Sequence, residues 1–285
     1  GLENEALWES SITFGNVDSS SSKFTILENG HLAVVSPTGP NTTPGGDVEL
    51  NIINQQGEFI IQGVDVASTS NIAERYTAIE SLSNGNFVVA FSKYNGHQNS
   101  GGSSYDLYAK IYDETGSLVN DIGQVNNAIF GNQDQPDIIK INDEGFIIAF
   151  RAHETNDTNF SASDYRVYGK RYDNDGNAQG DEFQINSSDI GGNPSNQEPP
   201  ALLFDEENGR LLTVFTTSEN GQDIKINSMN IDAAFDHTYS TISDEIEFSS
   251  ASRDEYFGHH VDTKPFISSN EDGNFLVTWT ENTGS

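Results

Sequence analysis

Short apolar runs that each follow a turn glycine recur along this chain. The clearest copies span 85–91 (GNFVVAF) and 145–150 (GFIIAF); related runs follow the glycines at 209 and 273, and a weaker one follows the glycine at 30. Consecutive glycines are 55, 60, 64 and 64 residues apart. Continuous apolar runs of this length between turn residues are typical of strands buried on both faces. Their regular recurrence predicts a repeat architecture.

Each repeat also contains further segments with the pattern of a strand. In the third repeat they span 136–141, 165–172 and 182–186, and turns ending in Glu-Gly or Asp-Gly separate them. Such turns favour tight hairpins. The second repeat follows the same plan, and five of its residues recur 60 positions later: Tyr105, Tyr108, Lys110, Tyr112 and Asp113. We therefore expect four antiparallel strands in each unit.

Four-stranded units in a closed array are typical of a β-propeller. We predict an all-β fold, a five-bladed β-propeller of four-stranded antiparallel blades in a single domain, 1–285. The fifth repeat stops after its second strand, at 274–280, whereas strand-like segments at 7–8 and 11–17 precede the first repeat. We expect N- and C-terminal strands to pair in one blade, which removes a free sheet edge. The expected blades span 19–67, 74–126, 134–186, 198–249, and 262–285 with 1–18.

Charge and composition exclude several partners. The chain has 44 acidic and 13 basic residues and a net charge of −31, whereas nucleic-acid binding needs clustered Lys and Arg. No apolar run approaches the ~20 residues of a membrane span, so we expect no membrane insertion. The absence of cysteine excludes disulfides and thiol catalysis, and is in keeping with a secreted or cell-surface protein. The acid excess suits solubility in a salty medium or the binding of hard cations such as Ca²⁺.

The repeat motif resembles that of a known class of protein. The run GFIIAF at 145–150, then YGKRYD at 168–173 and EFQIN at 182–186, is similar to repeats of very large secreted bacterial adhesins and RTX-type surface proteins. The resemblance is clear in the second and third repeats and weaker in the others. It implies a propeller-like module, monomeric within a longer chain, that contributes to attachment or ligand binding.

Acidic residues stand at a fixed distance before the repeat glycines. Counting back eleven positions from each glycine gives Ser19 in the first repeat and a carboxylate in the other four: Glu74, Asp134, Glu198 and Asp262. These positions fall just before the first strand of each unit, which is the innermost strand of a propeller blade. We expect them to ring one mouth of the central channel and to bind a cation or a polar ligand such as a sugar. Tyr105 and Tyr165 open the third strands nearby and are candidates for stacking on a sugar ring.

The turn after the third strand of the third repeat offers a candidate calcium site. Asp173, Asp175, Asn177 and Asp181 place oxygen donors at nearly alternate positions, as in the first half of a calcium-binding loop. The glycine comes too early for a complete loop, and Gln184 stands where the bidentate glutamate would be. A plain hairpin turn explains the same residues.

Three functions remain open at this point. The first is a non-catalytic adhesion module that recognises an extracellular glycan or another polar surface ligand, assisted by Ca²⁺. The second is a five-bladed-propeller glycosidase, whose acid and base would come from Glu74, Asp134, Glu198 and Asp262; its chemistry needs one carboxyl with a raised pKa and one ionised partner. The third is a passive spacer. The sequence favours the first and contains no serine nucleophile elbow or phosphate loop.

Overall fold

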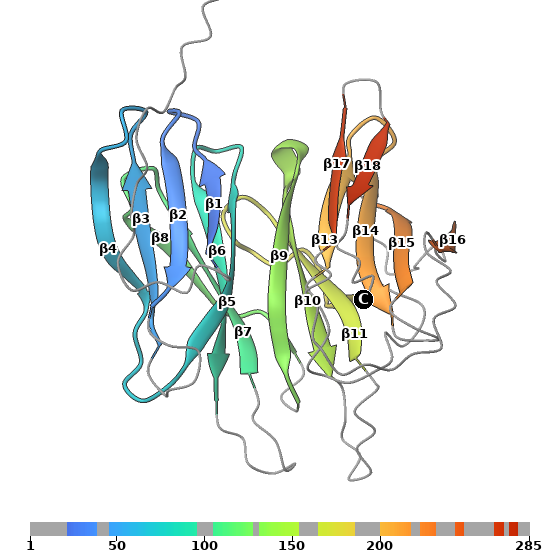
Figure 1. Ribbon diagram of the computed structural model, residues 1–285, viewed down its shortest axis with the longest axis horizontal. Coiled ribbons are helices and arrows are strands. Elements are labelled where there is room, and N and C mark those ends of the chain that lie inside the picture. The colour runs from blue at the N-terminus through green and yellow to red at the C-terminus, as the bar shows by residue number, and fades with distance from the viewer. Residues whose placement is uncertain are drawn as a thin grey trace, which may run out of the picture.

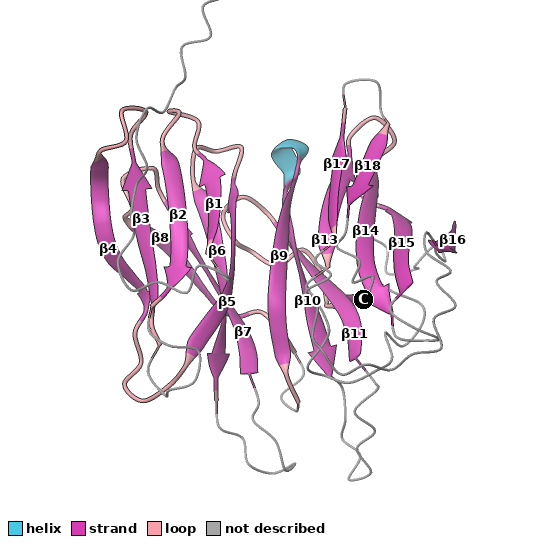
Figure 2. Ribbon diagram, in the orientation of Figure 1, coloured by secondary structure: helices cyan, strands magenta, loops and turns pink. Residues whose placement is uncertain are grey.

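The computed structural model describes residues 22–38, 46–95, 105–127, 131–153, 165–185, 200–217, 223–231, 243–247, 265–270 and 274–278. These residues form antiparallel strands and a single turn of 3₁₀-helix, η2 (Asn142–Glu144) (Figure 2). In this part of the chain no helix is long and apolar enough to cross a membrane. The all-β expectation is therefore confirmed.

The first two blades are four-stranded sheets whose strands pair in chain order. Blade 1 contains β1 (Lys23–Ile26), β2 (Leu32–Pro37), β3 (Val48–Ile53) and β4 (Phe59–Ala67). Blade 2 contains β5 (Glu74–Ser81), β6 (Phe87–Tyr94), β7 (Tyr105–Tyr112) and β8 (Leu118–Gln124).

The later blades follow the same order (Figure 1). Blade 3 contains β9 (Gln133–Ile141), β10 (Gly145–His153), β11 (Tyr165–Tyr172) and β12 (Phe183–Gln184). Blade 4 contains β13 (Ala201–Asp205), β14 (Arg210–Thr217), β15 (Asp223–Asn230) and β16 (Ser243–Glu247). The described part of blade 5 is β17 (Phe266–Ser269) and β18 (Phe275–Thr278).

The first strand of each blade is the innermost one, and these strands contact one another in the order β1, β5, β9, β13 and β17. Between the sheets lie separate apolar layers, one at each junction from blade 1 to blade 5. The apolar runs at 85–91 and 145–150 supply β6 and β10, whose side chains are buried on both faces of their sheets. The predicted propeller of four-stranded antiparallel blades is confirmed in this way.

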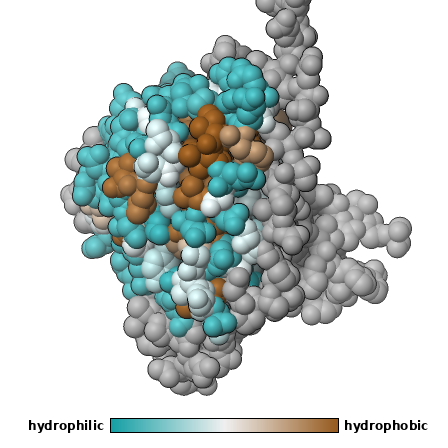
Figure 3. All heavy atoms as spheres, turned by 90° about the vertical axis from the view of Figure 1, so that its left-hand side faces the viewer, coloured by the Kyte–Doolittle hydropathy of each residue, from teal (hydrophilic) through white to brown (hydrophobic). Residues whose placement is uncertain are grey.

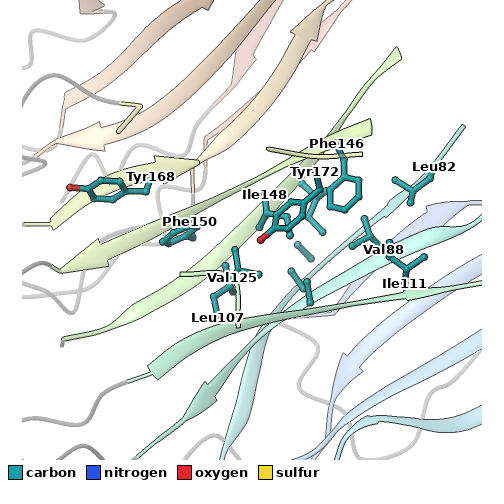
Figure 4. Close-up of a cluster of buried hydrophobic side chains, with 14 of the residues drawn as sticks. Leu82, Val88, Leu107, Ile111, Val125, Phe146, Ile148, Phe150, Tyr168 and Tyr172 are labelled. Atoms are coloured by element: carbon teal, nitrogen blue, oxygen red, sulfur yellow. The ribbon is translucent and has the colours of Figure 1, made fainter. Parts of the chain in front are cut away.

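Aromatic pairs repeat within these layers. Phe87 stacks on Tyr112 and Phe91 on Tyr108 in blade 2, with ring centroids 5.8 Å and 6.0 Å apart. Blade 3 has the corresponding pairs, of which Phe146 and Tyr172 are 5.3 Å apart. Figure 4 shows these two rings beside Leu82 and other blade 2 residues. The recurring Phe and Tyr residues are therefore core, because cross-strand stacking adds to the burial of their large apolar area.

The recurring lysine of the third strand joins each blade to the one before it. Lys110 donates from Nζ to the carbonyl oxygen of Val66 at 2.7 Å, and Lys170 donates to that of Val125 at 3.0 Å. In blade 4 the amide of Asn227 takes this place and donates to the carbonyl of Ile185. A charged donor to a buried carbonyl stabilises the junction and leaves an orphaned acceptor when it is removed.

Replacing Lys110 with methionine is expected to lower the free energy of unfolding by about 1–3 kcal/mol. The methionine keeps the apolar stem of the lysine but leaves the carbonyl of Val66 without its donor. Urea unfolding of the purified protein measures the change. Lys170→Met at the next junction should cost about as much, and losses below ~0.5 kcal/mol for both variants would contradict the tether.

Apolar side chains remain exposed at the two ends of the described array. On β1, Phe24 and Ile26 are 67% and 65% exposed, and on blade 5 Phe266 and Leu276 are 59% and 62% exposed. Figure 3, seen from the side of β4, shows further apolar residues gathered on that face. Closure of the ring by the chain ends involves residues 1–21 and 279–285, which lie outside the described residues. The closure and the blade boundaries therefore stay predictions.

Candidate functional site

The first residues of two adjacent innermost strands carry the candidate carboxylates. Glu74 opens β5 and Asp134 is the second residue of β9; they are 1% and 3% exposed. We expected both residues just before their strands. Instead, β5 begins two residues and β9 three residues earlier than predicted, because Glu74 pairs with Lys93 and Asp134 with Arg151 on the neighbouring strands. Both carboxylates therefore belong to the rigid sheets rather than to loops.

A bulge follows each carboxylate. The pairing of β5 with β6 shifts between Arg75 and Thr77, and Tyr76, the residue left over, has a φ of 51°. The pairing of β9 with β10 shifts beside Gln135, whose φ is 53°. Left-handed backbone costs a residue other than glycine about 1 kcal/mol or more, and bulges of this kind re-aim side chains at functional sites.

Asp134 is held as an ion pair inside the protein. Arg151 Nε lies 2.8 Å from one carboxylate oxygen of Asp134, and Nη2 lies 2.9 Å from the other. Both side chains are buried. A bidentate guanidinium at this distance stabilises the ionised carboxylate and fixes its plane.

Glu74 has the opposite environment. Both of its carboxylate oxygens are buried, and no hydrogen bond of good geometry reaches them from the described residues. Burial raises the pKa of Glu74; weak hydrogen bonding from Thr69 and the charge of Lys93 oppose the rise, whereas Asp47 adds to it. The two adjacent innermost strands therefore offer a buried carboxyl whose pKa is raised and a carboxylate that is paired with a guanidinium.

Tyrosines and an arginine lie between these two carboxylates. Tyr105 opens β7, as the sequence predicts, and its ring packs edge-on against Tyr76 and Tyr94, with centroids 6.2 Å and 5.5 Å away. The guanidinium carbon of Arg75 lies 4.9 Å from the centroid of the Tyr105 ring. Burial raises the pKa of Tyr105, and the charges of Arg75 and Asp134 also act on its hydroxyl. Tyr105 therefore lies close to both Arg75 of blade 2 and Asp134 of blade 3.

Sequence reasoning missed the polar residues that support this end of the ring. Asp106, 2% exposed, accepts hydrogen bonds from Asn95 and from Asn126, the latter at 3.0 Å. The side-chain oxygen of Gln135 is buried and has no partner in the described part of the chain. The lack of a regular spacing left these residues without a signal in the sequence.

The remaining predicted site residues are placed only in part. Glu198 and Asp262 lie outside the described residues, so their approach to Glu74 and Asp134 stays a prediction. Tyr165 pairs through its backbone with His153 at the start of β11, as Tyr105 pairs with Tyr94 in blade 2.

The predicted calcium loop is a hairpin turn. The carboxylate of Asp173 accepts hydrogen bonds from the backbone amides of Asp175 and Asn177, at 3.0 Å and 2.8 Å, and from the side chain of Asn177. These bonds use the oxygens that a cation would need and lower the pKa of Asp173 against the effect of burial. Asp181 is exposed, and the described residues contain no group of three or more potential metal ligands. We therefore correct the calcium interpretation: the carboxylate stabilises the turn.

A second pair of carboxyl groups lies farther along the innermost strands. Glu80 is near the end of β5, and Asp137 is in the middle of β9. Burial raises the pKa of Glu80 to about 7, helped by the charge of Asp137 and opposed by Lys140. Burial likewise raises the pKa of Asp137 to about 6, opposed by Lys23 of β1 and by the amide of Leu202, 3.0 Å from its oxygen. Groups from three innermost strands thus act on this pair.

The stability of the fold is expected to decrease between about pH 4.5 and pH 7, and Glu80→Gln should reduce that decrease. Within this window the folded protein retains a proton on Glu80 that the unfolded chain has released, so rising pH favours unfolding. Chemical denaturation at pH 5 and pH 8 measures the effect. The exposed Glu114→Gln serves as the control, and an unchanged pH dependence in Glu80→Gln would refute the assignment.

Comparison with known proteins gives structural neighbours but no sequence relatives. No protein-family profile matches the sequence, and no curated protein matches it significantly. Among solved structures, the chain is similar to an α-L-arabinanase from Penicillium chrysogenum complexed with arabinobiose, with 12% identity and a TM-score of 0.57 over 92% of this chain and 76% of that one.

Two further solved structures share this fold. One is an α-L-arabinofuranosidase from Fusarium graminearum in complex with an iminosugar inhibitor, with 12% identity and a TM-score of 0.56 over 88% of this chain and 68% of that one. The other is an α-L-arabinofuranosidase from Lactobacillus brevis, with 10% identity and a TM-score of 0.53 over 91% of this chain and 82% of that one.

These neighbours overturn the resemblance drawn from the repeats. The three solved structures compared above are an arabinanase and two arabinofuranosidases, and not repeats of adhesins or RTX-type proteins. The interpretation as a non-catalytic adhesion module rested on that resemblance and is wrong with it. The repeated residues that carried it are core pairs and blade tethers, which a propeller of any function requires.

Proposed function

We propose that this protein is a glycoside hydrolase that cleaves furanosides, with arabinofuranosides as the first substrates to test. The observation that carries the proposal is the contrast between two carboxyl groups on adjacent innermost strands. Glu74 is buried without an ion pair among the described residues and has a raised pKa, whereas Asp134 is paired with Arg151. Glycosidases need this division between a proton donor and an ionised carboxylate. The arabinanase and arabinofuranosidases that share the fold support the choice of substrate.

In the proposed reaction the protonated carboxyl of Glu74 donates its proton to the glycosidic oxygen, and the bond from that oxygen to the anomeric carbon breaks. The carboxylate of Asp134 either takes a proton from the attacking water or itself attacks the anomeric carbon. The separation of the two carboxyls in the complex selects between these routes. Glu198 and Asp262 are candidates for a third carboxylate at the same mouth.

The buried acceptor atoms at this end of the ring fit a sugar. The side-chain oxygen of Gln135 lacks a donor among the described residues, and the two oxygens of Glu74 have only weak hydrogen bonding from Thr69. Buried polar atoms without partners are costly, and a ligand rich in hydroxyl groups supplies the missing donors. The left-handed backbone at Tyr76 and Gln135 lies within two residues of each carboxylate.

We also propose that the enzyme works outside the cell on a glycan. The high acidic charge and the lack of cysteine support this location.

Hydrolysis of aryl α-L-arabinofuranosides, followed by release of the aryl group, tests the proposed function. Proton NMR of the fresh product shows whether the anomeric configuration is kept or inverted. Glu74→Gln and Asp134→Asn should each lower turnover by roughly 10²–10⁴-fold. Glu144→Gln is the matched control. Glu144 lies in η2, away from Glu74, and its carboxylate pairs with Arg171 of β11. Lack of turnover across aryl furanosides and pyranosides, or turnover untouched by both variants, would refute the proposal.

A further inference from the structure

Arg75 differs from the arginines that form ion pairs in the described part of the chain. Arg151, Arg171 and Arg210 each hold a carboxylate: those of Asp134, Glu144 and Asp205. Arg75 forms no ion pair with a described carboxylate, and its guanidinium lies over two tyrosine rings. The distances from its central carbon to the ring centroids are 5.8 Å for Tyr76 and 4.9 Å for Tyr105. In a chain with 44 acidic and 13 basic residues, it is unusual for a partly buried arginine to have no acidic partner among the described residues.

The carboxylates at this end of the ring have other partners in the described part of the chain. Asp134 pairs with Arg151. Lys93 lies across from Glu74 on one side and from Asp106 on the other, and Asp106 also accepts hydrogen bonds from Asn95 and Asn126. None of these contacts uses the guanidinium of Arg75.

Tyrosines hold the guanidinium in place. Cation–π contacts with Tyr105 and Tyr76 hold the guanidinium of Arg75, which also hydrogen-bonds to the side chain of Tyr105. The N–H groups left over by these contacts can pair with a carboxylate. Because Tyr105 also lies near Asp134, a ligand group bound at Arg75 would be next to the proposed catalytic carboxylate.

We propose that Arg75 anchors a carboxylate-bearing sugar residue, a uronate, beside the glycosidic bond that this enzyme cleaves. The inference rests on the proposed function for the catalytic step but makes a separate claim about binding. The tyrosines present apolar faces to the sugar ring, and Arg75 pairs with its carboxylate. A neutral sugar would supply no anion to the guanidinium, which has none among the described residues.

Binding measurements with matched ligands test this inference. The probes are trigalacturonate, its methyl ester, which has the same shape without the charge, and the neutral arabinotriose. Titration calorimetry on the intact protein should give an affinity for trigalacturonate at least roughly tenfold above that for its ester. This preference should shrink as salt is raised from 50 to 500 mM, because the contact is ionic.

Arg75→Gln separates recognition from packing. It should weaken trigalacturonate binding roughly tenfold and leave the affinity for the ester unchanged. The matched control is Arg210→Gln, which removes the same charge at the Asp205 pair in blade 4 and should change neither affinity. Equal losses for acid and ester would show that Arg75 only supports the tyrosines, and equal affinities for the two ligands in the unchanged protein would refute the proposal.

The same experiment distinguishes this inference from the proposed function. Glu74→Gln removes the proposed proton donor without touching Arg75, and should bind trigalacturonate at least as tightly as the unchanged protein. Binding of the uronate without turnover of any glycoside would refute the hydrolase and retain the anchor. Turnover of arabinofuranosides without a preference for the uronate would refute the anchor and retain the hydrolase.

Discussion

Glu74→Gln is expected to stop turnover and, at the same time, to make the fold more stable. The variant keeps the shape of the side chain but cannot donate a proton, so kcat should fall roughly 10²–10⁴-fold. Stability should rise by about 1 kcal/mol at pH 8, because burying a carboxyl without a partner costs free energy that a neutral amide reduces. A gain in stability on loss of activity is typical of a residue kept for function.

The pH dependence of that gain identifies its cause. The folded pKa of Glu74 is raised above the value of 4.5 that applies to the unfolded chain. The cost of Glu74 therefore grows as the pH rises above about 4.5, and the advantage of the glutamine should be small at pH 4 and larger at pH 8. Urea unfolding at both pH values measures it, with Glu144→Gln as the control. A variant that is inactive and less stable at pH 8 would mean that Glu74 supports the fold.

The architecture could be predicted from the sequence because the same physical requirement recurs from blade to blade. The second strands β6, β10 and β14 are buried between two sheets, so their repeats show an apolar run after a turn glycine, such as 146–150. The hydrogen bonds that join adjacent blades are not all made by the same residue type. Lysine makes them at Lys110 and Lys170, whereas Asn227 makes the corresponding bond in blade 4. A search for identical residues therefore loses the pattern in blade 4.

The repeat glycines located two of the candidate carboxylates, but their chemistry depends on neighbours that are distant in sequence. The pairing of Asp134 with Arg151 is set by the register of β9 and β10, including a bulge that the spacing does not reveal. The raised pKa of Glu80 arises partly from Asp137 on another blade. Such contacts depend on strand register and on how one blade packs against the next, and no periodicity in the sequence encodes them.

Residues of the scaffold also explain the mistaken resemblance to adhesin repeats. The motif that resembles adhesin repeats consists of turn glycines, stacked Phe–Tyr pairs and the tether lysine. These residues meet the demands of packing one sheet on the next. The residues that distinguish this chain chemically, Arg75 and Gln135 among them, lie at or beside the bulges and outside the motif.

Arg151→Met is expected to be the most destabilising single change at the site, lowering the free energy of unfolding by about 3–5 kcal/mol. It removes both hydrogen bonds to Asp134 and leaves a carboxylate that is 3% exposed without its compensating charge. Arg151→Lys keeps the charge but loses the bidentate geometry, so it should cost less. The double variant Asp134→Leu with Arg151→Met should recover most of the loss, since no buried charge remains. Urea unfolding of the unchanged protein, the single variants Asp134→Leu and Arg151→Met, and the double variant gives the coupling free energy. A loss below ~1 kcal/mol for Arg151→Met would show that this ion pair contributes little to stability.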